Sequence, residues 1–325
     1  MYYLMNLVTY FLLSAVALSI TSLSLLTALR TQHYLMFCLK GLILCLVGLE
    51  VIREGLYLLN LKPMFLRKKL RRQNEGRLLV IMTLVVPFTY FLSSSLSINP
   101  VLASGLVGLL ASLLVKKYEV AIYCASFAGM ASALGFESIS LFVLAGLITG
   151  LIYIFSQEVF AGFGGKLGAM AFFSTLVLAL VNQSFKVTYL EVEVVFQFEI
   201  VVYFILGAFL THVIRLVTGQ SSVFCSSALG IIAGGSLPFL YPNQGVFLAA
   251  AVFSGTFIGM TAPNRFEKYR YFILAGCMGS LIYLYSQPYF NGLGGKLGAI
   301  AFISGLAVNS GRKSYHYLRS FLDDK

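Results

Sequence analysis

A segment of 24 residues occurs twice in this chain, and this repeat constrains the fold more than any other feature. Residues 151–174, LIYIFSQEVFAGFGGKLGAMAFFS, return at 281–304 as LIYLYSQPYFNGLGGKLGAIAFIS, with 16 of 24 positions identical at a constant offset of 130. The match extends upstream without a gap to Gly129 and Gly259. We therefore expect two copies of one structural unit, as in many transporters and channels.

The composition indicates that the surroundings of this fold are a lipid bilayer. Charged residues make up 11% of the 325 residues, whereas a soluble domain carries about 25%. Apolar runs approach the roughly 20 residues that a helix needs to cross the hydrocarbon core, which predicts an all-α polytopic membrane protein. The segments are 7–29, 34–56, 78–97, 99–115, 119–135, 139–157, 166–184, 196–215, 221–239, 244–262, 270–287 and 296–311, about twelve in all. Four of them, 119–135, 166–184, 244–262 and 296–311, are glycine-rich or short, and we expect broken or re-entrant helices there.

The expected organisation is a hairpin of two transmembrane helices followed by two five-helix repeats. The boundaries are 1–61 for the hairpin, 62–77 for a basic cytoplasmic loop, 78–184 for the first repeat, 185–195 for an external loop, 196–311 for the second repeat and 312–325 for a cytoplasmic tail. An odd number of crossings separates equivalent residues, so the second copy is expected to be inverted. The arrangement resembles inverted-repeat transporters and channels, including urea channels, in topology only, because the urea-channel signature LPxxTxPF does not occur.

The net charge of +11 is placed as in a membrane protein, so we expect no nucleic-acid partner. Basic residues gather at 62–77, and the positive-inside rule then puts both termini in the cytoplasm of a bacterial inner or plasma membrane. Contact of 62–77 with anionic lipid is a second interpretation of the same charges. The other expected partners are the bilayer, a small molecule or ion and, as an open alternative, further copies of the chain. We expect no cofactor and no metal, because the cysteines and histidines lack ligand spacing.

The motif GxGGKLGA, at 162–169 and 292–299, is the strongest candidate site. Glycine N–H groups at a helix N-terminus attract anions, and a lysine adds a full charge. A tight turn with a surface-directed lysine is the structural alternative. The candidate substrate-binding residues are Gly164, Gly165 and Lys166 with their equivalents Gly294, Gly295 and Lys296, then Ser126 and Thr256, Tyr153 and Tyr283, and Gln157 and Gln287.

Two glutamates, Glu137 and Glu267, occupy equivalent positions and are candidate gating residues. The predicted topology puts Glu267 on the same side as Lys166 and Glu137 on the same side as Lys296, so that ion pairs could close the two ends of a pathway. Solvated loop charges are the alternative.

These features favour an integral membrane transporter or channel over an enzyme. A small polar solute would cross between the two repeats, and an anion is favoured over a cation because the lysine lies on the better anion-binding scaffold. The alternatives are a membrane-embedded scaffold or assembly subunit, and a lipid-handling protein or membrane enzyme. In a scaffold, the lysines and glutamates kept in both copies would need a purely structural reason.

Overall fold

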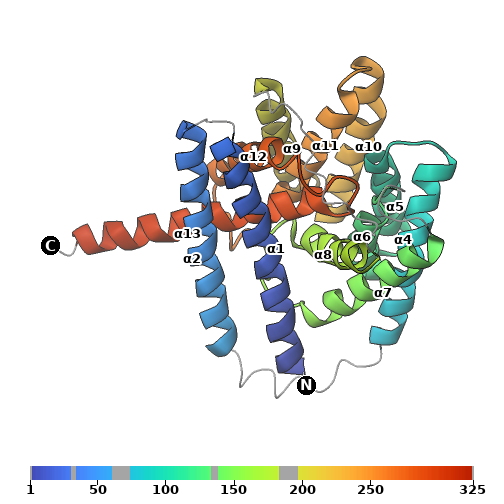
Figure 1. The fold of residues 1–325 in the computed structure, drawn as a ribbon, viewed down its shortest axis with the longest axis horizontal. Helices are drawn as coiled ribbons and strands as arrows, with labels where there is room; N and C mark the ends of the chain where they lie inside the picture. The colour runs from blue at the N-terminus through green and yellow to red at the C-terminus, as the bar shows by residue number, and fades with distance from the viewer. Residues whose placement is uncertain (1, 31–33, 61–73, 133–137, 183–196, 324–325) are drawn as a thin grey trace.

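The computed structural model describes residues 2–30, 34–60, 74–132, 138–182 and 197–323. Over these ranges the chain forms twelve α-helices and no strand (Figure 1). They are α1 (Tyr2–Arg30), α2 (Tyr34–Asn60), α4 (Glu75–Ser95), α5 (Pro100–Leu114), α6 (Glu119–Ala128), α7 (Ile139–Phe155), α8 (Lys166–Val181), α9 (Phe198–Thr218), α10 (Ser222–Leu240), α11 (Gly245–Gly259), α12 (Tyr269–Tyr285) and α13 (Lys296–Asp323). Each predicted apolar segment coincides with one of these helices. The all-α prediction is therefore confirmed for the described residues.

Five helices, α1, α2, α4, α9 and α10, are long and apolar enough to cross a membrane, as expected of an integral membrane protein. Other helices are shorter: α6 has 10 residues and α11 has 15. At 1.5 Å per residue these two helices are about 15 and 22 Å long, less than the roughly 30 Å of a hydrocarbon core.

The last helix departs from the predicted boundaries. The segment 296–311, expected to be broken or re-entrant, instead lies within α13, a continuous helix of 28 residues. The helix also includes most of the predicted tail, and residues 315–323 are exposed. Figure 1 shows α13 crossing α2, with its C-terminal end projecting beyond the rest of the molecule.

The two repeat units pack against each other through equivalent helices, α5 on α10 and α8 on α13. At the α8–α13 crossing, an added Cβ on Gly168 would lie 2.5 Å from the Cα of Gly298, and one on Gly298 would lie 2.7 Å from the Cα of Gly168. The backbone bonds are reciprocal as well. The Ser132 N–H donates to Gly292 O and the Ala262 N–H to Gly162 O, both at 2.9 Å. Such mutual contacts are the property of a self-complementary interface.

The N-terminal hairpin of α1 and α2 packs mainly on α13 and carries paired charges. The buried carboxylate of Glu50 accepts hydrogen bonds from Asn309 at 2.6 Å and from Lys313 at 2.8 Å. Glu54 forms a two-point contact with the guanidinium of Arg265, in the loop between α11 and α12. Because unpaired charges within an apolar fold are costly, these contacts fix where the hairpin docks.

Candidate functional site

The loops that precede α8 and α13 have the same backbone conformation. Phe160, Gly162 and Gly165 have φ values of 48°, 83° and 78°, and the residues 130 positions later have 59°, 82° and 82°. Glycine adopts this left-handed region freely, whereas a phenylalanine there costs about 1–3 kcal/mol. The Phe160 ring is fully buried and packs on Tyr10 and Phe302, which holds the strained residue in place.

The other motif glycines allow close approach between the two copies. A methyl group on Gly294 would lie 2.5 Å from Ala128 O and 2.6 Å from Phe127 O, at the C-terminal end of α6. One on Gly164 would meet Phe257 O at the matching end of α11. The Gly164 N–H donates to the Thr261 hydroxyl at 3.2 Å. The sequence indicated glycines whose N–H groups face a ligand, and the structure shows that their small size brings the copies into contact.

Each motif lysine is buried and donates to carbonyl groups just beyond the end of the preceding helix. The Nζ of Lys166 lies 2.8 Å from both Ser156 O and Val159 O, and 3.4 Å from Gln157 O. The Nζ of Lys296 lies 2.8 Å from Ser286 O and 2.6 Å from Tyr289 O. Those carbonyls follow the negative C-terminal ends of α7 and α12, where a cation is stabilised. Each lysine thus ties its loop to the preceding helix.

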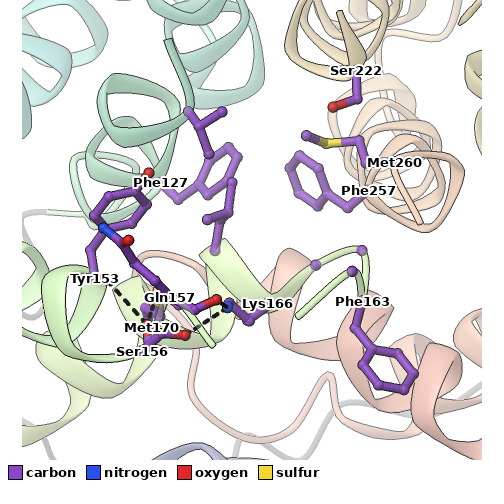
Figure 2. Close-up of a pocket in the computed structure, with 15 residues that line it drawn as sticks. Phe127, Tyr153, Ser156, Gln157, Phe163, Lys166, Met170, Ser222, Phe257 and Met260 are labelled. Carbon is purple, nitrogen blue, oxygen red and sulfur yellow. Dashed lines mark hydrogen bonds between the residues drawn. The ribbon is translucent and has the colours of Figure 1, made fainter. Parts of the chain in front are cut away.

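The two motifs lie on the walls of two cavities. The first has a volume of about 350 Å³, and its lining includes the predicted residues Tyr153, Gln157, Gly164, Gly165 and Lys166 (Figure 2). The second has a volume of about 290 Å³, and its lining includes the predicted residues Tyr283, Gln287, Gly295 and Lys296. Among the described residues that line each cavity, the lysine is the one charged side chain. The two cavities are therefore equivalent under the repeat.

Two aromatic side chains, Phe127 and Phe257, line both cavities. Their ring centroids are 4.7 Å apart, and each residue is only 2% exposed. Figure 2 shows the two rings facing each other, with Lys166 below them. They stand between the cavities.

Three of the predicted binding residues, Gly294, Ser126 and Thr256, line neither cavity. Ser126 and Thr256 are fully buried, and their hydroxyl groups bond to Ser104 and Ser226, each at 2.8 Å. They fasten α6 to α5 and α11 to α10. These two bonds also show how α5 aligns with α10 in the repeat. Ser104 and Ser226 bond to equivalent residues, so they are themselves equivalent, and their offset is 122 rather than 130.

The predicted gating residues lie away from the lysines where the structure describes them. Glu137 is outside the described residues. The exposed Glu267 pairs with Arg312 at 2.8 Å, while Lys166 contacts backbone carbonyls. The Lys166–Glu267 pair is not formed in this conformation and stays a prediction for another one.

Sequence reasoning did not single out Phe127 and Phe257 as site residues, nor the Glu54–Arg265 pair. The aligned repeats do pair Phe127 with Phe257. In a chain with so many apolar residues, however, nothing in the sequence distinguishes this pair of aromatic residues from the other aromatic residues. The Glu54–Arg265 contact joins residues 211 positions apart, which no local pattern indicates.

Comparisons with protein-family models, with curated proteins and with solved structures give no match for this chain.

Proposed function

We propose that this chain is an integral membrane transporter or channel and that a small polar solute passes through the two cavities in turn. The observation that carries the proposal is the pair of equivalent cavities separated by a thin barrier to which each repeat contributes one ring, Phe127 and Phe257. In repeat-built transporters, substrate sites lie at the interface between the repeats. A scaffold would need neither the cavities nor their matching linings.

The second copy is inverted relative to the first in this proposal. The reciprocal packing of α8 on α13 and of α5 on α10 supports a two-fold relation between the copies. The short helices α6 and α11 end beside each other, because Phe127 and Phe257 near their C-termini are in contact. We infer that these two short helices enter from opposite faces of a bacterial inner or plasma membrane and that both chain termini are cytoplasmic. The distribution of basic residues agrees with this orientation.

The charges around the cavities favour an anion as the solute. Each described lining contains a lysine and no acidic residue, and the lysine is at the first turn of a helix, α8 or α13. The hydrogen-bond partners of each lysine are neutral carbonyl groups, so none of these partners is a carboxylate that would neutralise an ammonium charge. A wall with one sign of charge and a low dielectric attracts the opposite ion.

The test is the anion-to-cation flux ratio of the purified protein in liposomes. Methionine keeps most of the length of lysine and removes the charge, so Lys166→Met and Lys296→Met should each lower the ratio. Lys268→Met is the matched control, because Lys268 is exposed and lines neither cavity. The ratio does not depend on how much protein is reconstituted, which separates a change of selectivity from a loss of folded protein. If all three variants have the same flux ratio as wild type, the two lysines do not determine selectivity and only hold their loops against the preceding helices.

One observation favours a scaffold or assembly subunit as the second candidate. The donor groups of Lys166 are directed to three carbonyl oxygens, as a structural lysine requires. Absence of flux for every ion and small neutral solute, in liposomes with folded wild type and also with folded variants of the residues between the cavities, would favour this function.

A further inference from the structure

The barrier between the cavities is part of a cluster of four rings arranged in matching pairs. Tyr123 and Phe127 have centroids 4.5 Å apart, and the equivalent Phe253 and Phe257 have centroids 4.6 Å apart. The cross-distances also match, 6.1 Å from Tyr123 to Phe257 and 6.3 Å from Phe253 to Phe127. None of the four is more than 2% exposed. Each repeat supplies half of one apolar plug.

The two outer rings are clamped by glycines of the neighbouring helices. A Cβ on Gly108 of α5 would lie 2.5 Å from the Tyr123 ring, and one on Gly230 of α10 would lie 2.5 Å from the Phe253 ring. The Tyr123 hydroxyl also bonds to the Ser226 hydroxyl at 2.9 Å. These rings are fixed by close packing on one side. The rings of Phe127 and Phe257, by contrast, border cavities on both sides of their contact, so they are the members of the plug with space to turn into.

A solute that passes from one cavity to the other must cross between two rings that offer no strong hydrogen-bonding group. Loss of hydration without replacement by protein groups is costly, and apolar constrictions exclude water for the same reason. The positive edges of aromatic rings are the part that tolerates a negative charge. The lysine in each cavity would attract an anion electrostatically and so offset part of the cost of its dehydration on either side of the rings. The centroid distance of 4.7 Å leaves no passage between the two rings in this conformation, which would be a closed state in the proposed transport function.

We propose that Phe127 and Phe257 form the barrier that selects the solute, and that it admits small monovalent anions with a low cost of dehydration, such as nitrate or thiocyanate, while it excludes sulfate and phosphate. This inference rests on the proposed transport function and identifies its substrate class. The two phenylalanines are specificity-determining residues. Because the repeats contribute equally, the two positions should be equivalent in their effect.

The experiment measures nitrate, thiocyanate and sulfate flux in liposomes containing wild type, Phe127→Ala, Phe257→Ala or a control. Phe142→Ala is the control, because Phe142 is equally buried, stacks on Tyr90 and lines neither cavity. Wild type should pass nitrate and thiocyanate faster than sulfate. Each cavity-side alanine variant should raise sulfate flux several-fold and bring the ratio closer to one, to a similar extent at both positions, whereas Phe142→Ala should keep the wild-type ratio.

Each outcome decides at least one of the two proposals. Flux in wild type with the same ion ratio in both alanine variants overturns the barrier and leaves the transport function standing. Flux only in the alanine variants supports the barrier as a closed gate. No flux in any folded variant overturns both, because removing one of the two rings between the cavities should open a passage between them. If an alanine variant does not fold, Phe127→Leu and Phe257→Leu keep the apolar volume and remove the ring edges. They should keep sulfate excluded and lower the nitrate and thiocyanate flux, and unchanged flux of these two anions would overturn the role of the rings.

Discussion

The crossing of α8 and α13 allows a prediction whose magnitude follows from the geometry. A Cβ on Gly168 would lie 2.5 Å from the Cα of Gly298 and 3.0 Å from Gly295 O. Non-bonded carbon atoms are most stable at about 3.5–4.0 Å, so Gly168→Ala must push the two helices apart by about 1 Å. Backbone atoms on the far side cannot turn away as a side chain can. Such overpacking costs about 1–3 kcal/mol, and the helix propensity of alanine returns about 1 kcal/mol.

The matched control is Gly235→Ala in α10, because a Cβ there would have no atom within 4 Å. It should gain the propensity of about 1 kcal/mol without the clash, so the two variants should differ by about 1–3 kcal/mol. Thermal unfolding in one detergent, followed by circular dichroism at helical wavelengths, measures this difference; the chain has no tryptophan to report by fluorescence. About 1 kcal/mol corresponds to about 2–4 °C in medium-sized domains. If Gly168→Ala and Gly235→Ala have the same melting temperature, and it is higher than that of wild type, the two copies are not packed backbone against backbone at this point.

Glu54→Gln should lower the melting temperature strongly, because it leaves the mostly buried guanidinium of Arg265 without its carboxylate, a loss of about 3–5 kcal/mol in the free energy of unfolding. Glu267→Gln is the control: this carboxylate is 62% exposed, so its loss should cost about 0–1 kcal/mol. Equal melting temperatures of the two variants would contradict this ranking. Single cysteines at the equivalent positions Ala161 and Asn291, in a background without the native cysteines, should react with a membrane-impermeant thiol reagent from opposite sides of the membrane, and labelling from the same side would refute the inversion.

The helices were predictable because their signal is local. Every apolar segment drawn from the sequence corresponds to a helix, since hydrophobic length is set by the bilayer and helix ends by glycine and polar residues. The continuation of α13 past the predicted end at 311 has a physical reason. The tail that follows is polar, but Lys313 reaches Glu50 and Arg312 reaches Glu267, and these tertiary contacts support a helix that hydropathy alone would end.

The candidate site was predictable in its residues and only partly in their roles. The repeat pointed to the lysines, the tyrosines and the glutamines, and these do line the cavities. A sequence repeat shows which residues are equivalent, but it does not show which residues are in contact. Gly164 packs against the C-terminal end of α11, a contact that depends on how the copies dock, and Ser126 bonds to α5 of its own copy, a contact that depends on how the helices pack within one repeat.

The contact between the hairpin and Arg265 gives the two cavities different mechanical surroundings although their walls match. Glu54 holds Arg265, whose guanidinium lies 4.3 Å from the centre of the Phe163 ring and whose Nε donates to Ala161 O at 3.0 Å. Position 135, its counterpart in the first copy, is a glycine and has no side chain that could be held in this way. Two unmodified copies would give an alternating device two resting states of equal free energy. In the proposed transport function, this contact on one copy alone would give the two states different free energies, and the hairpin would determine which of them is more populated.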